Sequence, residues 1–142
     1  MSRMKILVCT FATLAMVMST YIPAQAEFLE TFHRNQPWVL QLASGNNRGE
    51  IAGTVYYLAG RKRDFDALPL VPAAATSTFE MGAIPHNVTR IIIEVDLPPN
   101  GSLAGQGIIT VTQGAQTFSA DMGGDFLLSS AASYRFVIEV AP

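Results

Sequence analysis

The stretch that decides the fold is TRIIIEVDL, residues Thr89–Leu97. Apolar and charged residues alternate along most of it, with Ile91, Ile93 and Val95 on one side and Arg90, Glu94 and Asp96 on the other. Successive side chains of an extended chain point to opposite faces, so the alternation places one face in a core and the other in water. The stretch therefore predicts a strand of an antiparallel sheet.

Similar alternation recurs before and after this strand. The further segments expected to form strands are residues 38–43, 50–58, 67–71, 78–81, 107–113, 116–121 and 133–140. Turn signals rich in glycine, proline and asparagine separate many of them, and residues 60–64 are expected to form a charged connection. Pro69 limits the segment 67–71 to a sheet edge or an extended loop, because proline cannot donate to the hydrogen-bond ladder of a sheet.

The order of these segments predicts the fold class. No amphipathic helical segment of about 10–15 residues separates the strands, which argues against a parallel βαβ sheet. We therefore expect an all-β protein, a single antiparallel β-sandwich of about seven or eight short strands, of immunoglobulin-like or jelly-roll type. A small closed barrel is the alternative. The sequence shows no internal repeat, and the Cys-Trp-Cys pattern of antibody domains is absent.

Residues 1–26 have the features of a secretory signal peptide. Arg3 and Lys5 form a short basic start, residues 6–17 are mainly apolar, and Ala24-Gln25-Ala26 matches the A-x-A cleavage pattern. Cleavage after Ala26 would leave residues 27–142 as the β-sandwich domain. The apolar run is shorter than the roughly 20 residues of a membrane-spanning helix, and retention of the segment as an anchor is the alternative.

The predicted signal peptide also indicates a compartment. The single cysteine, Cys9, lies inside it, so the mature chain has no thiol for a disulfide or a metal. Export without disulfides leads us to expect a bacterial periplasmic or secreted protein, with no membrane span after cleavage. The first mature residues, 27–36, are expected to form either a short helix or an N-terminal arm, since Pro37 stops a helix at this point.

Catalytic groups are scarce in the mature chain, so we expect a protein that is not an enzyme. Its two histidines, His33 and His86, are far apart in sequence, and no G-x-S-x-G nucleophile motif is present. A hydrolase that uses one of these histidines with Asp64 or Asp66 is the least favoured alternative.

The acidic residues do not match a known metal or glycosidase pattern. Glu94 and Asp96 share a strand face with Arg90, which favours an exposed charge ladder over a catalytic carboxylate pair. Asp121 and Asp125 flank a Gly-Gly turn, but the middle ligand and the closing glutamate of a calcium loop are missing. We expect no metal and no cofactor, and calcium at Asp121 and Asp125 stays open as an alternative.

Charge in this chain is low and nearly balanced. Nine Lys+Arg and eleven Asp+Glu give a net charge of −2, and charged residues make up 14% of the chain, against about 25% in an average domain. The basic run Arg61-Lys62-Arg63 is too small for a nucleic-acid interface. A surface poor in charge favours coverage by a protein partner or by copies of the same chain.

These observations lead us to expect an exported, non-enzymatic β-sandwich that acts as an interaction or structural module of the cell envelope or exterior. The alternative is a carbohydrate- or small-ligand-binding module, for which Trp38, Tyr57 and Arg90 are the expected contact residues. Adjacent residues of a strand point to opposite faces, so one of Tyr56 and Tyr57 is expected to be exposed. An exposed ring would stack on a sugar or anchor a protein partner.

Overall fold

The structure, a computed structural model, describes residues 24–27, 31–44, 50–97, 107–122 and 132–142. The apolar part of the predicted signal peptide, the connection 98–106 and Asp125 lie outside these ranges. Within the described ranges the regular structure is entirely β-strand, which confirms the expected all-β class. None of these ranges holds a helix that is long and apolar enough to cross a membrane.

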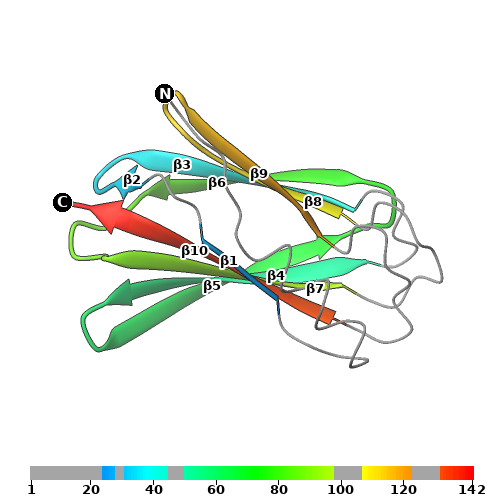
Figure 1. The fold of residues 1–142 in the computed structure, drawn as a ribbon, viewed down its shortest axis with the longest axis horizontal. Coiled ribbons are helices and arrows are strands. Elements are labelled where there is room, and N and C mark those ends of the chain that lie inside the picture. Colours follow the sequence, from blue (N-terminus) through cyan, green and yellow to red (C-terminus); the bar gives the residue numbers. More distant parts are fainter. Residues whose placement is uncertain (1–23, 28–30, 45–49, 98–106, 123–131) are drawn as a thin grey trace.

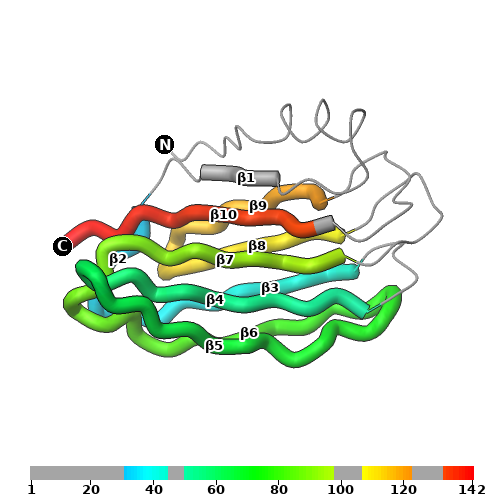
Figure 2. Tube along the Cα trace, turned by 90° about the horizontal axis from the view of Figure 1, so that it is seen from below, coloured from blue at the N-terminus to red at the C-terminus, as the bar shows by residue number. Residues whose placement is uncertain are grey.

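The strands form two sheets that lie face to face as two layers, an arrangement compatible with a β-sandwich (Figure 1; Figure 2). The large sheet has the order β1 (Ala24–Glu27), β10 (Ala132–Ala141), β7 (Arg90–Leu97), β4 (Ile51–Ala59) and β5 (Lys62–Val71), with β2 (Phe32–His33) also paired to β10. The small sheet has the order β6 (Thr76–Ala83), β3 (Pro37–Ala43), β8 (Gly107–Gln113) and β9 (Gln116–Met122). All pairs are antiparallel except β1 and β2, which run parallel to β10.

The hydrophobic core lies between the two sheets and takes alternate residues from each strand. In β7, Ile91, Ile93 and Val95 have no exposed surface, as the alternation predicts. The facing small sheet supplies Leu40 and Val111, which are also fully buried. Removal of this apolar surface from water is the main force that holds the two layers together.

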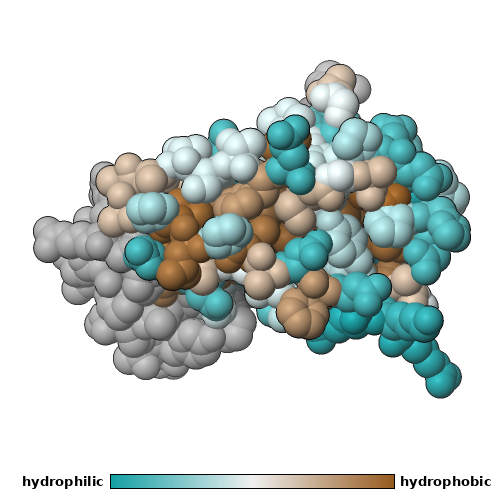
Figure 3. Space-filling model, turned by 180° about the vertical axis from the view of Figure 1, so that it is seen from behind, coloured by the Kyte–Doolittle hydropathy of each residue, from teal (hydrophilic) through white to brown (hydrophobic). Residues whose placement is uncertain are grey.

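The side of the molecule between β5 and β6 is closed by side chains rather than by backbone pairing. These two strands end their sheets on the same side, and they do not pair with each other (Figure 2). Partly buried Tyr57, Phe79 and Met81 pack against the core. Figure 3 shows this side, where hydrophobic residues form a band between more hydrophilic ones.

Residues 27–36 were expected to form either a short helix or an N-terminal arm; their described part contains no helix, since Glu27 belongs to β1 and Phe32–His33 form β2, both beside β10. One local expectation is wrong. The charged connection at 60–64 is instead a two-residue turn, since β4 continues to Ala59 and β5 begins at Lys62. Pro69 does lie in an edge strand, as expected.

The same pattern of strand pairing occurs twice in the chain, although the sequence shows no internal repeat. In the half β3–β6 the first strand pairs with the fourth, and in the half β7–β10 the first strand again pairs with the fourth. The middle two strands of each half form a hairpin, β4–β5 or β8–β9, that joins the sheet of the other half. Thus β4 pairs with β7, and β8 pairs with β3, so neither sheet is complete without both halves.

Glycines occupy matching positions in the two exchanged hairpins. Gly60 and Gly114 each begin a two-residue turn with positive φ, 62° and 57°, a conformation that favours glycine. At the same spacing before each turn lies a second, buried glycine, Gly53 or Gly107. A Cβ at Gly53 would lie 3.2 Å from the Glu94 carbonyl oxygen, and one at Gly107 would lie 2.9 Å from that of Ala43. The backbone approach therefore leaves no room for a side chain at Gly107 and little room at Gly53.

We expect Gly107→Ala to lower the free energy of unfolding by about 1–3 kcal/mol, because the added methyl group meets a main-chain oxygen that cannot move aside. Chemical denaturation of the two proteins measures this difference. Thr117→Ala, at an exposed position on the neighbouring β9, should change stability by less than about 0.5 kcal/mol. Equal stability of Gly107→Ala and the parent protein would contradict the close approach.

Candidate functional site

The outer face of the large sheet carries a row of apolar residues that crosses four strands. Phe65 of β5, Tyr56 of β4, Ile92 of β7 and Val137 of β10 lie opposite one another in succession. Phe65 is 64% exposed and Ile92 is 8% exposed, while Tyr56 and Val137 are intermediate. We call these four residues the apolar row. It is formed by side chains that point away from the core, on strands whose other face is buried.

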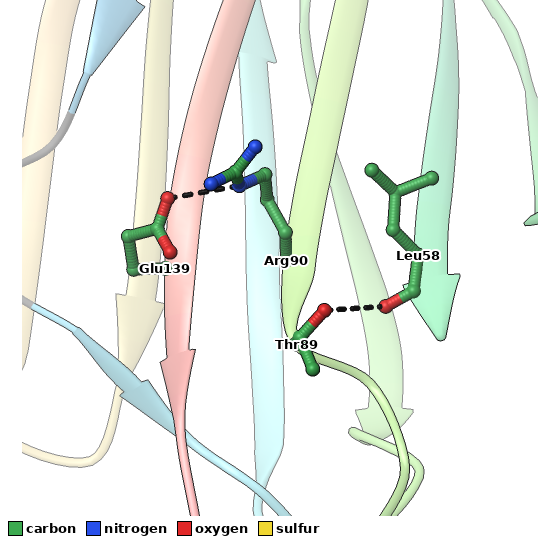
Figure 4. A network of polar contacts seen from close by, with 4 residues as sticks. All are labelled: Leu58, Thr89, Arg90 and Glu139. Carbon is green, nitrogen blue, oxygen red and sulfur yellow. Dashed lines mark hydrogen bonds and ion pairs between the residues drawn. The ribbon is translucent and has the colours of Figure 1, made fainter. Parts of the chain in front are cut away.

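On each side of the apolar row lies a row of mainly polar residues, which we call a polar row. On one side, Arg63, Leu58, Arg90 and Glu139 lie opposite one another in succession, and on the other side Ala67, Thr54, Glu94 and Arg135 do so. The Arg90 Nε atom lies 2.9 Å from a Glu139 carboxylate oxygen (Figure 4), and the Arg135 Nε atom lies 3.7 Å from a Glu94 oxygen. These pairs confirm the expected charge ladder on an exposed strand face.

The backbone next to Arg90 is fixed where β7 begins. The Thr89 amide donates a 2.8 Å hydrogen bond to the Leu58 carbonyl oxygen, and its hydroxyl donates to the same oxygen at 3.2 Å (Figure 4). This contact ties the start of β7 to the end of β4. The polar row that contains Arg90 and Leu58 therefore has a defined position relative to the apolar row.

Three side chains of the β4–β5 hairpin form a contact cluster at one end of the apolar row. The rings of Tyr56 and Phe65 have centroids 6.0 Å apart with an interplanar angle of 48°. The Arg63 guanidinium carbon lies 3.8 Å from the centroid of the Tyr56 ring, within the range of a cation–π contact. We call Tyr56, Arg63 and Phe65 the aromatic patch. The patch combines two aromatic rings with one positive charge on the outer face of the hairpin.

The residues expected as ligand contacts do not share one surface. Trp38 and Tyr57 come together, but inside the sandwich: Trp38 is 1% exposed, and its Nε1 atom donates a 3.3 Å hydrogen bond to the Tyr57 hydroxyl. Their rings meet edge to face at 6.4 Å. Arg90 lies on the opposite face of the large sheet, paired with Glu139. Of the Tyr56–Tyr57 pair, Tyr57 therefore points into the sandwich and Tyr56 lies on the outer face, and both side chains are intermediate in exposure.

Sequence reasoning missed the aromatic patch for a physical reason. Phe65 lies in a segment where every residue from Lys62 to Ala67 is exposed, so no hydrophobic alternation indicates a strand there. The turn signal of Gly60 with a two-residue loop would have placed Phe65 opposite Tyr56, had the hairpin been recognised.

Burial raises the pKa of Tyr57 above its ordinary value of 10.0. Desolvation of the half-buried ring is the largest cause, and the negative charge of Asp66 acts in the same direction. The hydrogen bond from Trp38 acts in the opposite direction, since it stabilises the phenolate. The folded protein therefore keeps this proton at a pH at which the unfolded chain releases it.

The histidines and aspartates of the hydrolase alternative lie on separate elements. His33 is exposed on β2, and His86 is exposed in the connection between β6 and β7. Asp64 and Asp66 are exposed on β5. Among the residues that the structure describes, no group of three or more His, Cys, Asp or Glu side chains is placed to hold a metal ion.

Comparison of the chain with protein-family models found no match, and comparison with curated proteins found no related sequence.

We expect the unfolding free energy of the parent protein to fall as pH rises above about 10, because the unfolded chain then loses the Tyr57 proton before the folded protein does. Tyr57→Phe should show a smaller loss over this range. At neutral pH the same variant should be less stable by about 1–3 kcal/mol, since the buried Trp38 Nε1 atom loses its acceptor. Denaturation at several pH values measures both effects.

The parent protein, measured at the same pH values and in the same buffers, is the reference for this experiment. A Tyr57→Phe variant with the parent's pH profile would show that Tyr57 does not titrate abnormally.

Proposed function

We propose that the protein is an exported, non-enzymatic β-sandwich that acts as an interaction module of the cell envelope or exterior and binds a protein partner through the outer face of its large sheet. The observation that carries the proposal is the aromatic patch, in which Phe65 is 64% exposed beside Tyr56 and Arg63. Leaving a phenylalanine ring in water costs free energy that a partner surface would recover.

The layout of the face fits a protein partner. Tyrosine and arginine are among the residues that supply most of the energy in protein interfaces. The apolar row is bordered on both sides by polar rows, which matches an interface with an apolar centre and a polar rim. The hydrogen-bonded ion pair Arg90–Glu139 holds two of the rim side chains in place before a partner arrives.

Export is the second part of the proposal. It is supported by the basic start, the apolar run and the Ala24-Gln25-Ala26 cleavage pattern. The expected location is a bacterial periplasm or the medium outside the cell. N-terminal sequencing of the protein recovered from its own host's envelope or medium tests this part, and Glu27 is the expected first residue.

The finer fold type also belongs to the proposal. In immunoglobulin domains the last two strands are neighbours in one sheet. Here the last strand, β10, pairs with β7, while β9 lies in the small sheet. We therefore infer a sandwich that shares the two-layer form of immunoglobulin-like domains but has its own strand order.

Carbohydrate binding is the second candidate function, and the exposed Phe65 ring beside Tyr56 favours it, because a sugar stacks on such a ring. The fluorescence of Trp38 is a poor reporter for this site, since Trp38 belongs to β3 of the small sheet and its ring is buried in the core. Calorimetric titration with a panel of glycans distinguishes the two candidates.

We expect a photo-crosslinking amino acid at position 65 to capture one defined protein in the native host, and Phe65→Ala to weaken the affinity of that purified partner by about 30-fold. Leu70→Ala is the matched control, because Leu70 lies on the same strand, is 56% exposed and is not part of the patch. It should leave the affinity unchanged.

Two results would contradict this function. Equal affinity losses in Phe65→Ala and Leu70→Ala would show that the patch is not the contact surface. Binding of a glycan that Phe65→Ala abolishes, without any protein captured at position 65, would favour the carbohydrate module.

A further inference from the structure

The repeated pairing pattern makes two sides of the sandwich equivalent. Exchange of the halves β3–β6 and β7–β10 puts β5 and β6 in the places of β9 and β10. We call these two sides the β5–β6 side and the β9–β10 side. Because Gly60 and Gly114 have matching places in the two hairpins, residues at equal distances beyond them are equivalent. The two sides can therefore be compared residue by residue.

A short strand of the chain itself lies along the β9–β10 side. This strand, β2, runs parallel to β10 with Phe32 opposite Val140. The Phe32 ring is fully buried, and its centroid lies 6.1 Å from that of Phe118 in β9. The His33 amide donates to Gln113 Oε1 at 2.6 Å, and Gln113 Nε2 donates to the His33 carbonyl oxygen at 2.9 Å. One ring on an added strand thus connects the two sheets on this side.

The described ranges of the chain place no comparable strand on the β5–β6 side. There β5 pairs with β4 alone, and β6 pairs with β3 alone. Residues 76–80 of β6 keep an unbroken register with β3, whereas β5 contains Pro69. Alternate backbone groups of an edge strand point away from its sheet and can pair with another strand, which proline prevents. The equivalent of β10, strand β6, is therefore the edge at which a strand can be added.

Matching residues of β5 and β9 differ in chemistry. Phe118 and Ala120 of β9 are buried apolar residues of the core. The residues at the same distances beyond the turn of the other hairpin are Asp64 and Asp66, and both are exposed. The β5–β6 side therefore has two carboxylates where the β9–β10 side has apolar side chains.

Both carboxylates lie on the inner face of β5. Asp64 is opposite Tyr57 and Asp66 is opposite the buried Val55, and residues opposite one another on paired strands share a face. Asp66 is near enough to Tyr57 for its charge to help raise the pKa of that phenol. Lys62, opposite Ala59 beside the turn, is the one basic residue on this face of β5. The face keeps a net negative charge.

Matching residues of β6 and β10 differ in burial. Phe79 lies opposite Leu40, and its equivalent in β10, Ile138, lies opposite Ile91. Ile138 is fully buried, whereas Phe79 is only partly buried, as is Met81. Figure 3 shows hydrophobic residues in a band along this side. The β5–β6 side thus presents apolar surface on β6 and carboxylates on β5.

This combination is complementary to a lysine or arginine side chain. The long aliphatic stem of such a side chain covers apolar surface while its charged end remains free to meet a carboxylate. A purely apolar ring in the same place would take Asp64 and Asp66 out of water without a charged partner, at a cost in free energy. The chemistry of this side therefore favours a basic residue.

We propose that an extended segment of a partner protein joins the small sheet along β6, parallel to it, and places a lysine or arginine side chain between Met81 and Asp64. This is the place equivalent to that of Phe32 on the β9–β10 side, where β2 also runs parallel to its edge strand. Main-chain hydrogen bonds to β6 would supply affinity, and the basic side chain would supply specificity. The surface is separate from the aromatic patch and goes beyond the proposed function.

Selection of random ten-residue peptides, displayed on phage, against the purified protein tests the proposal. The selected peptides are expected to share one lysine or arginine, with apolar residues at alternate positions. Their binding should shift the backbone amide NMR signals of residues 76–80 and slow the hydrogen exchange of these amides. Failure to select any peptide, selection without a shared basic residue, or shifts confined to other strands would overturn the proposal.

A set of variants tests the two carboxylates with one selected peptide. Asp64→Asn combined with Asp66→Asn is expected to weaken its binding by about fivefold to tenfold, because the basic side chain loses its charged partners. Asp64→Lys combined with Asp66→Lys should instead favour the same peptide with glutamate in place of its basic residue. Asp121→Asn is the matched control, because Asp121 is an exposed aspartate on the outer face of the small sheet, and it should leave the affinity unchanged.

Phe65→Ala separates this surface from the proposed function. Phe65 belongs to the same strand as Asp64 but lies on the outer face of the large sheet, so its loss should leave peptide binding unchanged. A loss of peptide affinity in Phe65→Ala, or equal affinities of the parent protein and the double asparagine variant, would overturn the proposal while leaving the aromatic patch as a candidate site.

Discussion

The exchange of hairpins between the two sheets is the constraint on which the rest of the structure depends. Each half of the chain supplies two strands to one sheet and a hairpin to the other, so β4 completes the large sheet beside β7, and β8 completes the small sheet beside β3. The strands that pair between the halves, β4 with β7 and β8 with β3, approach closely at Gly53 and Gly107, where the absent side chain leaves room for a main-chain oxygen of the neighbouring strand. These close approaches fix how far each hairpin lies from its neighbour, and so they set the register in which core and surface residues alternate.

That register also creates the candidate binding face. Once Tyr57 points inward to accept the hydrogen bond from Trp38, Tyr56 has to point outward, and its neighbours across the sheet are Phe65 and Ile92. The buried aromatic contact and the exposed aromatic patch are therefore two consequences of one strand position. A single-residue shift of β4 would exchange them, placing the Tyr56 ring in the core and the Tyr57 ring in water.

Sequence patterns predicted the strands that have one face buried in the core and the other exposed to solvent. TRIIIEVDL alternates between core and solvent, so both its existence as β7 and its buried residues could be foreseen. The start of β5 is exposed on both faces, so its residues carry no such pattern. Which of Tyr56 and Tyr57 faces outward depends on a partner in the other sheet, Trp38, and pairing between distant strands cannot be obtained from one strand's sequence. The repeated pairing pattern cannot be predicted for the same reason, because it depends on which distant strands pair with each other.

The interlocked strand order also affects how the protein can fold. Each sheet takes strands from both halves, and β7 lacks one of its two partner strands until β10 pairs with it. Folds dominated by pairing between distant segments form slowly. A chain that forms its core slowly stays extended for longer, and a protein exported as proposed above would cross a translocation channel in that state.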